Sequence, residues 1–571
     1  MGTEMHANSE SHPQVLLITL AALPERCDSL CKAILHEQGE ITAVRPESSL
    51  PDPGQFDAII IDGPQTGLHA SDIERLVRYV QAGGFVLAIN AAPETPEGLL
   101  SQSLLGCHSL PRLQLGEFFV RTAPAGHELL RRIPDEFALL DSFAPLQPLD
   151  GHTTTLINAR LRFHDQPVII EHVLGKGRVV VSALGGTREG LETPALRTLF
   201  RRSLLTRNGK QAEKALGVGI VGYGPLGGVG YAHGVAVAHT PGLRLVAACD
   251  RAADRLEAAR ADFPDLKAYA EAEELARDPE VDIAIVATPP SAHVDLIRLM
   301  LKAGKHVVSE KPLCLTVKDA DSLYEEAVAG GLVLTVSQNR RWDADFLAIK
   351  RTINTGMLGE VFNIETFVGS FAHPCREWHS ETAISGGTEY DWGSHHIDWI
   401  LQLMGSPPQQ VSAIAQKRVW HDVSNHDQIR IRMLWEDGRE AEFMHSDLAA
   451  IRKPKFYLQG TQGTLSGHYR PLVSESIEPG RGYVRLESHH AEAPAELILK
   501  RYEFATGHLS EQTLPLVVPE PYPFHRNLAD HLHSDGTPLA VSYQSVRNVI
   551  AVLEAAHESA EHGGVTLAPP L

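Results

Sequence analysis

The chain has few of the features that mark secreted or membrane proteins. No apolar run approaches the roughly 18 residues that a membrane span needs. The N-terminal stretch MGTEMHANSESHPQ is polar, without the apolar core of a secretory signal, and His6 breaks the myristoylation pattern. Six cysteines are scattered without a spacing that predicts disulfides or a metal site. These absences predict a cytoplasmic protein with reduced thiols.

Positive charge is also scarce, with 51 Lys and Arg against 71 Asp and Glu and a formal net charge of −20. This balance disfavours nucleic acids and anionic membranes as partners, but it leaves room for a small basic pocket that binds a phosphate. Internal repeats and low-complexity segments are lacking too. The 571 residues exceed a single core and predict about three domains at ~100–200 residues each.

Residues 14–205 alternate strand and helix patterns, which predicts an α/β domain with a parallel sheet. Apolar runs at 15–21, 56–63 and 85–90 read as buried strands. The stretch SDIERLVRYVQAGG reads as a helix that starts with a capping box, Ser71 and Glu74, and stops at Gly83. We expect residues 1–13 to be disordered and the polar residues 206–214 to form a linker.

A second alternating unit begins at Leu216, and the pattern changes near Arg340. QIRIRMLWEDGREAEF alternates apolar and polar residues around Asp437-Gly438, which predicts a β-hairpin. KFYLQGTQGTLSG reads as another strand–turn–strand, and SYQSVRNVIAVLEAAHESAEH reads as a helix. These patterns predict domains at 215–338 and 339–571, the second with a largely antiparallel sheet.

The stretch GVGIVGYGPLGGVGYAHG contains two overlapping G-x-G-x-x-G motifs, which are typical of dinucleotide-binding loops. The copy formed by Gly222, Gly224 and Gly227 leaves the predicted strand 216–221, as the fingerprint requires, whereas the earlier copy lies inside that strand. Asp250 ends the next predicted strand at about the 20-residue spacing expected for the residue that binds the adenosine ribose. Asp250 favours NAD over NADP, although Arg251 could meet a 2′-phosphate.

Asp391 and His395 lie four residues apart in DWGSHHIDWI, which has helical character, so one helix face would carry both side chains. An imidazole can accept the hydroxyl proton of an alcohol, Asp391 could bind the hydroxyl or tune His395, and a lysine such as Lys311 can stabilise an alkoxide. The alternatives are a surface Asp–His pair, a solvated lysine, or a metal site of Asp391, His395 and His373 or His379. The last matches no familiar zinc spacing, so we expect no metal.

The segment VDIAIVATPPSAHVDLIRLMLKAGKHVVSEKPL, with the glycine loop, QNRRWDADF and SGGTEYDWGSHHIDWILQLMG, resembles the Gfo/Idh/MocA oxidoreductase family over about residues 215–571. The resemblance implies a Rossmann domain, a C-terminal domain with a large open sheet, a tightly held nicotinamide cofactor, carbohydrate substrates and a homo-oligomer, a dimer or tetramer. This chain differs from the family pattern at the glycine loop. The family often has a histidine three residues after the third glycine, whereas this chain has Gly230 at that position and His233 three residues later. This looks like a three-residue insertion.

Carried onto this chain, the resemblance implies three sets of residues. The catalytic set is Lys311, Asp391 and His395. The cofactor set is Gly222, Tyr223, Gly224, Leu226, Gly227, Asp250, Arg251, Thr288, Pro289, His293, Glu310, Lys311 and Asn339. The substrate set is Lys311, Arg341, Arg376, Trp378, Asp391, His395 and His396, with a structural ion pair as the alternative for Arg341 and packing as the alternative for His396.

Residues 14–205 resemble ThuA-like proteins, which have a flavodoxin-like fold related to class I glutamine amidotransferases, through YVQAGGFVLAINAA, RIPDEFALLDSF and LGKGRVVVSALGG. The amidotransferase nucleophile is a cysteine on the sharp turn after a strand. The corresponding turn here has Asn90 and Ala91, so we expect no glutaminase activity and a docking or substrate-shaping role.

The sequence thus predicts an NAD-dependent dehydrogenase that acts on a secondary alcohol of a sugar, polyol or glycoside, with C3 of a sugar as one candidate position. One alternative is a glycosidase or lyase that oxidises its substrate transiently and recycles bound NAD. Another is a sensor that binds NAD or a sugar without turnover.

Overall fold

The computed structural model describes residues 14–571 except 20–29, 31–39, 46–47, 64–67, 94–97, 124–126, 131–132, 150, 162–163, 206–214, 225–227, 376, 479, 481, 489–491, 518–519 and 534–536. The predicted disordered segment 1–13 and linker 206–214 therefore lie outside the described residues. The chain forms two compact units, Met1–Lys214 with Arg526–Pro538, and Ala215–His525 with Leu539–Leu571.

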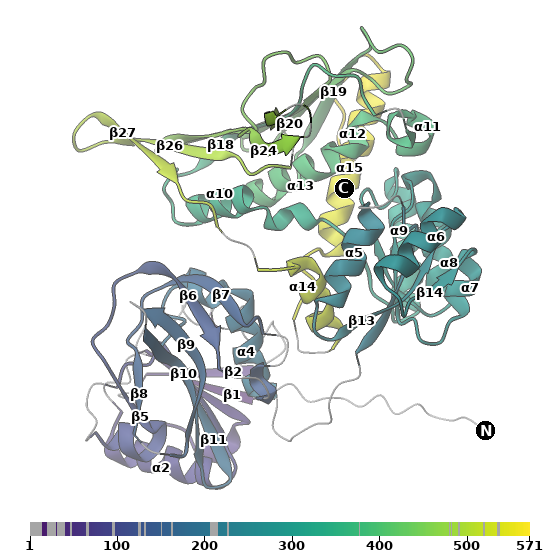
Figure 1. Ribbon diagram of the computed structural model, residues 1–571. Coiled ribbons are helices and arrows are strands. Elements are labelled where there is room, and N and C mark those ends of the chain that lie inside the picture. Colours follow the sequence, from purple (N-terminus) through teal and green to yellow (C-terminus); the bar gives the residue numbers. More distant parts are fainter. Residues whose placement is uncertain are drawn as a thin grey trace. The chain divides into compact units, whose positions relative to one another are not determined.

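The first unit is built around one mixed nine-stranded sheet with the order β2-β1-β3-β4-β11-β10-β9-β6-β7 (Figure 1). The strands β2, β1, β3, β4 and β11 run parallel, and β10, β9, β6 and β7 extend the sheet with antiparallel pairs. The sheet strands are β1 Gln14–Thr19, β2 Glu40–Val44, β3 Ala58–Asp62, β4 Phe85–Ile89, β6 Gly116–Thr122, β7 Glu136–Asp141, β9 Thr153–Leu161, β10 His164–Leu174 and β11 Gly177–Ser182. A separate small ladder joins β5 Cys107–Ser109 and β8 Leu146–Pro148, and the helices are α2 Ala70–Gln81, α3 Arg188–Glu192 and α4 Pro194–Leu205.

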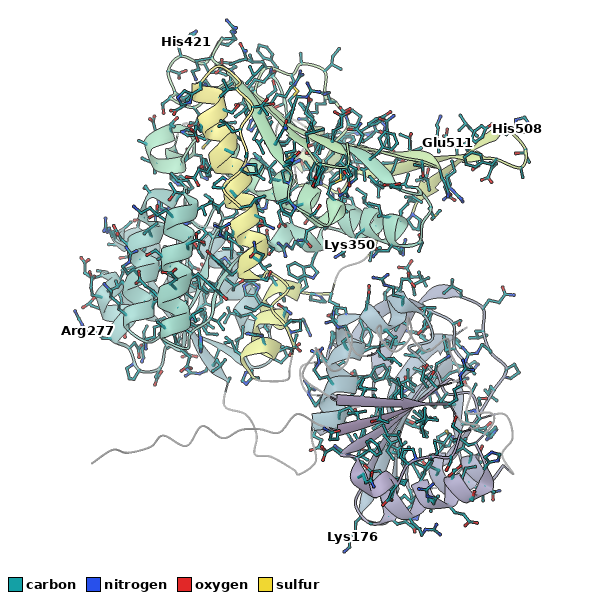
Figure 2. All side chains as sticks on the ribbon, turned by 180° about the vertical axis from the view of Figure 1, so that it is seen from behind. Lys176, Arg277, Lys350, His421, His508 and Glu511 are labelled. Carbon is teal, nitrogen blue, oxygen red and sulfur yellow. The ribbon has the colours of Figure 1, made fainter. Side chains whose placement is uncertain are left out.

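Local sequence signals in this unit were mostly correct. The predicted strands appear as β1, β3 and β4, all buried, and the turn between β10 and β11 carries Lys176 at its tip (Figure 2). The capping box was wrong: α2 begins at Ala70 behind His69, so Ser71 lies inside the helix. The expected parallel sheet is parallel only in part, because four strands without intervening long helices add antiparallel.

Residues 526–538 belong to the first unit rather than to the predicted C-terminal domain. They include most of α14 Pro523–Leu532. The Thr198 hydroxyl donates to Asp530 at 3.4 Å, and Arg201 donates to the Thr537 hydroxyl at 3.3 Å. Both of these partners lie on α4, so this helix contacts the returning segment.

The second unit opens with a six-stranded, wholly parallel sheet of order β14-β13-β12-β15-β16-β17, the doubly wound order of a Rossmann fold. Its strands are β12 Leu216–Val221, β13 Leu243–Cys249, β14 Lys267–Tyr269, β15 Ile283–Val286, β16 His306–Ser309 and β17 Leu334–Val336. Its helices are α5 Val229–Ala238, α6 Ala253–Asp262, α7 Ala272–Arg277, α8 His293–Lys302 and α9 Val317–Ala329. Ligands in such folds bind at the carboxyl ends of the strands.

The same unit continues into an eight-stranded sheet of order β19-β20-β21-β18-β22-β23-β26-β27, antiparallel except for the β18–β21 pair. This confirms the predicted mostly antiparallel sheet, and both predicted hairpins appear, as β20–β21 and β22–β23. The strands are β18 Val361–Gly369, β19 Gln410–Gln416, β20 Gln428–Leu434, β21 Glu440–Ser446, β22 Phe456–Gly460, β23 Gly463–His468, β26 Glu496–Glu503 and β27 His508–Leu514, and β24 Leu472–Glu478 pairs with β25 Gly482–Ser488 outside the sheet.

Helices α12 Thr388–Asp391, α13 Gly393–Met404 and α15 Tyr543–Glu561 contact this sheet, α10 Ala344–Asn354 packs against α13, and the short α11 Thr382–Ser385 contacts α12. The long helix α15, yellow in Figure 1, packs against α13 and β19 on one side and against α9 of the Rossmann half on the other. Among the described residues, none of the helices has both the length and the apolar character of a membrane span.

A buried ion pair lies in the core between these helices and the sheet. Lys455 Nζ lies 2.7 Å from Asp345 Oδ2, and the two side chains are 1% and 0% exposed. Asp345 also accepts the backbone N–H of Ala495 at 2.7 Å and that of Phe346 at 2.8 Å. Because every partner is satisfied, the pair is tolerated in a low-dielectric core, but loss of either charge would leave the other unpaired.

We therefore expect Lys455→Met to destabilise the second unit by about 3–5 kcal/mol, because it leaves a buried, unpaired carboxylate. Chemical denaturation followed by tryptophan fluorescence measures this. Lys453→Met is the matched control, since Lys453 is exposed and its carboxylate partners lie 3.7 Å away, so its loss should cost less than about 1 kcal/mol. Equal costs for the two variants would contradict the assignment.

Candidate active site

The glycine loop follows β12 as predicted, and two of its glycines have structural reasons to be glycine. Gly222 has φ +90°, and a Cβ there would lie 2.8 Å from the Ala287 carbonyl oxygen. Gly230 lies in the first turn of α5, where a Cβ would lie 2.2 Å from the Tyr223 carbonyl oxygen. In the dinucleotide-binding motif, the third glycine allows the helix to pack closely against the strand. Gly230 has this role, while Gly227 and Leu226 lie outside the described residues.

The contact between Gly230 and Tyr223 changes where the three-residue insertion lies in the glycine loop. With Gly230 as the third glycine, the extra residues lie between Gly224 and Gly230, and His233 falls three residues after the third glycine. His233 is 4% exposed. Its Nε2 lies 2.9 Å from Glu310 Oε1, and its Nδ1 lies 3.0 Å from His525 Nε2. Helix α5 is therefore linked to the segment that carries Lys311.

Asp250 follows β13 at the carboxyl edge of the sheet. Its Oδ2 accepts the Gly224 N–H at 3.0 Å, and its Oδ1 accepts the Ala252 N–H at 3.0 Å. A carboxylate has acceptor sites beyond these two bonds, so ribose hydroxyls could still bind it. Arg251 is exposed beside it. Tyr223 presents only its backbone here, because its ring is buried and its hydroxyl donates to Asp262 at 2.6 Å.

The loop after β15 contains Thr288, Pro289 and His293. The Thr288 hydroxyl is buried and has no hydrogen-bond partner in the part of the chain that the structure describes. Both ring nitrogens of His293 face backbone carbonyls, Nε2 at 2.7 Å from Thr288 and Nδ1 at 2.8 Å from Pro312. His293 therefore connects the loop that contains Thr288 to the loop that contains Pro312. Pro289 precedes a 3-10 turn at 290–292. Asn339 is exposed at the start of another 3-10 turn.

These residues fit a dinucleotide. Gly222 and Gly230 allow close approach of the backbone, and α5 offers a helix N-terminus after the loop. Asp250 supplies a carboxylate after the second strand, and the Thr288 hydroxyl has no hydrogen-bond partner among the described residues. A nicotinamide cofactor bound at this edge would supply a hydride acceptor or donor next to the segment 310–312.

Lys311 and Asp391 form the central ion pair of the site. Lys311 Nζ donates to Asp391 Oδ1 at 2.6 Å and reaches the Asp391 carbonyl oxygen at 3.3 Å. Burial opposes ionisation of Asp391, but the charge and hydrogen bond of Lys311, helped by His379 and His445, keep its pKa below the usual value. The pair connects the loop after β16 to the end of α12, so it joins the two halves of the second unit.

Glu310 is the neighbour that ties this loop to the glycine loop. Burial opposes its ionisation too, but the hydrogen bond to His233 and the charge of Lys311 hold its pKa below the usual range. Its Oε2 also accepts the Lys311 backbone N–H at 3.2 Å. Glu310 is therefore an ionised residue that links α5 to Lys311.

His395 lies in the first turn of α13, after the break at Trp392 that separates α12 from α13. Burial, reinforced by the charges of Lys311 and Arg340, lowers its pKa well below 6.5, so the imidazole is neutral at pH 7. Its Nδ1 is buried and lacks a hydrogen-bond partner among the described residues. Asp391 is hydrogen-bonded to Lys311, which favours a role on the lysine over the predicted tuning of His395.

The predicted substrate residues divide into two groups. Arg341 is buried and forms a two-pronged ion pair with Asp398, with further bonds to the Ala540 carbonyl and the Ser545 hydroxyl. This favours the structural alternative for Arg341. His396 is 1% exposed and packs on Trp399 and Phe443, which favours packing.

Trp378 remains near the predicted site, stacked on His379 with ring centroids 3.7 Å apart, and Arg376 lies outside the described residues. The predicted metal alternative grouped Asp391 and His395 with His373 or His379. Within the described ranges, the metal-type cluster that forms is a different one, Cys375, Glu377 and His379. The sequence offered a weak signal for it, three ligand-type residues at alternate positions.

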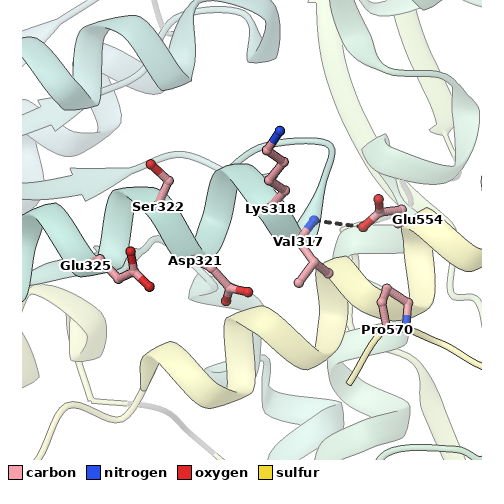
Figure 3. Close-up of a pocket in the computed structure, with 7 residues that line it drawn as sticks. All are labelled: Val317, Lys318, Asp321, Ser322, Glu325, Glu554 and Pro570. Atoms are coloured by element: carbon pink, nitrogen blue, oxygen red, sulfur yellow. Dashed lines mark hydrogen bonds between the residues drawn. The ribbon is translucent and has the colours of Figure 1, made fainter.

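A hollow of about 550 Å³ lies elsewhere in this unit, between α9 and α15 beside Pro570 (Figure 3). Its acidic groups are engaged: Glu554 accepts the Val317 N–H at 2.7 Å, and Asp321 binds Arg547 at 2.7 Å and the Tyr543 hydroxyl. None of the predicted site residues lines it, so it has no part in the candidate site.

Comparison with known proteins agrees with this geometry. Residues 216–338 match the family model described as an oxidoreductase family with an NAD-binding Rossmann fold, GFO_IDH_MocA, and residues 346–466 match the GFO/IDH/MocA C-terminal domain. Both models start beyond the first unit, so the ThuA-like resemblance of residues 14–205 stays a prediction.

Individual relatives are similar over the same region. The scyllo-inositol 2-dehydrogenase (NADP(+)) IolW of Bacillus subtilis is 28% identical over 358 residues, which are 62% of this chain and 96% of that relative. The uncharacterized oxidoreductase YdgJ of Escherichia coli is 30% identical over 359 residues, 60% of this chain and 96% of YdgJ.

Among solved structures, an NAD-binding protein from Listeria innocua is 28% identical with a TM-score of 0.53, covering 62% of this chain and 97% of that protein. Two family models match, and the relatives are covered over nearly their whole length. The chain therefore belongs to the Gfo/Idh/MocA family of NAD(P)-dependent oxidoreductases.

Proposed function

We propose that the chain is an NAD-dependent dehydrogenase that oxidises or reduces a secondary alcohol of a sugar, polyol or glycoside, with C3 of a sugar as one candidate position. The observation that supports this most is the Lys311–Asp391 ion pair beside a neutral His395, at the carboxyl edge of a dinucleotide-type sheet. Inositol dehydrogenases among the relatives support a polyol-like substrate.

In this proposal Lys311 and Asp391 receive the substrate hydroxyl. The ammonium group donates to the hydroxyl oxygen and stabilises the alkoxide that develops there. Asp391 orients Lys311 and compensates its charge in the absence of substrate, because the two groups are bonded at 2.6 Å. A substrate hydroxyl would share the Lys311 ammonium group with Asp391.

His395 takes the hydroxyl proton. A neutral imidazole has a free lone pair, and the low pKa of His395 guarantees this form at pH 7. Among the described residues the buried Nδ1 has no hydrogen-bond partner, which supports a ring that is available to the substrate on that side. A bound nicotinamide cofactor would supply the hydride acceptor.

The first test is Lys311→Met. We expect kcat/KM with NAD and a sugar or polyol panel to fall by roughly 10²–10⁴-fold, because charge stabilisation of the alkoxide is lost while the side chain keeps its length. Absorbance of NADH measures turnover, and Lys302→Met is the matched control, because Lys302 is exposed at the end of α8.

Two outcomes would redirect the proposal. Aglycone release without net NADH formation would point to the NAD-recycling glycosidase or lyase. NAD binding with no turnover on the panel, and the same affinities in Lys311→Met and His395→Gln, would point to the sensor.

The pH dependence tests His395. Because burial depresses its folded pKa below 6.5, the neutral base persists as the pH falls through 6.5 and is lost only in a more acidic range. We expect the acid limb of log kcat/KM for alcohol oxidation to have its midpoint below pH 6.5, and His395→Gln to lose that limb along with most activity. A midpoint above 6.5 would exclude His395 as the base.

Cofactor choice gives a third test. The Asp250 carboxylate would repel a 2′-phosphate, so the wild type should use NAD with a higher kcat/KM than NADP. Asp250→Asn keeps an acceptor for the Gly224 N–H and should raise relative NADP use about tenfold or more, which is ~1.4 kcal/mol. Arg251→Ala should shift the ratio the other way, and a wild-type preference for NADP would refute the NAD assignment.

A further inference from the structure

A short segment between β18 and α11 gathers three side chains of metal-ligand type. The ligand atoms of Cys375, Glu377 and His379 all lie within 4.8 Å of one another. The three residues alternate along the chain. Glu377 precedes the 3-10 turn Trp378–Ser380, and its carbonyl accepts the Ser380 N–H at 3.0 Å, so this turn brings His379 back toward Cys375.

The donor set has a clear preference. A thiolate, an imidazole and a carboxylate together suit Zn²⁺ rather than the hard cations Ca²⁺ and Mg²⁺, which take oxygen ligands. Tetrahedral coordination at Zn–S of about 2.3 Å and Zn–N or Zn–O of about 2.1 Å needs ligand atoms roughly 3.3–3.8 Å apart. Since the ligand atoms lie within 4.8 Å of one another, binding would need them to approach by at most about 1.5 Å, and Cys375 and Glu377 are exposed.

His379 is held in place by contacts with residues outside the cluster. Its backbone carbonyl accepts the Asn425 side-chain amide at 2.7 Å, and its ring is stacked on Trp378. Its Nδ1 is buried, and the described residues offer it no hydrogen-bond partner. A buried imidazole nitrogen without a partner is costly unless something binds it, and a metal ion on one ring nitrogen would also fix the tautomer of the other.

The chemistry of Cys375 points the same way. Cys107, Cys249 and Cys314 are buried free thiols, whereas Cys375 is an exposed free thiol close to two other ligand-type side chains, Glu377 and His379. The cluster is also near the catalytic pair, because the charges of Asp391 and Lys311 act on His379. A cation held here would therefore lie at the edge of the proposed substrate site.

We propose that Cys375, Glu377 and His379 bind one divalent transition-metal ion, with Zn²⁺ favoured, and that water or a substrate oxygen takes the fourth position. Three protein ligands with one open position is the arrangement of zinc sites that meet substrate, whereas purely structural sites use four protein ligands. The proposal goes beyond the dehydrogenase assignment and does not depend on it.

The test uses the full-length protein, stripped with chelator and titrated with Co²⁺ and then Zn²⁺. We expect one Co²⁺ per chain with the intense visible bands of tetrahedral cobalt and a thiolate-to-cobalt charge-transfer band in the near ultraviolet, both displaced by Zn²⁺. Cys375→Ser should abolish the charge-transfer band and weaken binding by about 100-fold, while the other five cysteines remain. His379→Ala should weaken binding similarly.

Glu381→Gln is the matched control, because it removes a carboxylate from the same segment that is not in the cluster, and it should leave the spectrum and affinity unchanged. Lys311→Met should also keep the cobalt spectrum, so failure of the dehydrogenase assignment and failure of the metal site are separable. A spectrum without the charge-transfer band, or one that Cys375→Ser leaves intact, would overturn the proposal. Thermal denaturation of Cys375→Ser checks that the fold is retained.

Discussion

The ion pair between Lys311 and Asp391 is the contact on which the candidate site depends. Lys311 comes from the loop after β16 of the Rossmann half, and Asp391 ends α12 of the half built on the open sheet. At 2.6 Å, with both side chains partly buried, the pair is a charge-assisted hydrogen bond in a medium less polar than water. It fixes where the sheet edge that would hold a dinucleotide meets the helices that carry His395. Neither half forms the constellation alone.

Several hydrogen bonds hold the segments that carry Lys311 and Asp391 in place. On the Rossmann side, His233 binds Glu310, and His293 binds the Pro312 carbonyl, so residues flanking Lys311 are held from two helices. On the other side, the Tyr390 hydroxyl donates to the Leu315 carbonyl at 2.7 Å. These bonds flank the pair on both sides, so a displacement of Lys311 would disturb a connected set of buried polar contacts.

The elements that could be predicted from sequence are those fixed by local pattern. Strands β12 and β13, the hairpin β20–β21 and helix α15 each follow from periodicity and turn residues within one window. The third glycine could not be assigned in this way, because G-x-G-x-x-G is satisfied at Gly227 while the close contact is with Tyr223 at Gly230. Arg341 shows the same limit: its chemistry suits a substrate pocket, but its partner Asp398 lies 57 residues away in sequence and only the fold brings them together.

The pairing of Asp391 was harder still to foresee, because helical spacing places it with His395 while tertiary structure gives it Lys311, 80 residues distant. That change alters the electrostatics of the whole site. The single positive charge of Lys311 acts on both neighbours in opposite senses: it favours the anion of Asp391 and disfavours the cation of His395. The charge of Lys311 therefore favours two of the forms that the proposed chemistry uses, a carboxylate at Asp391 and, together with burial, a neutral imidazole at His395. An alcohol entering this site would meet a donor for its oxygen and an acceptor for its proton, which is the arrangement that hydride abstraction from the same carbon requires.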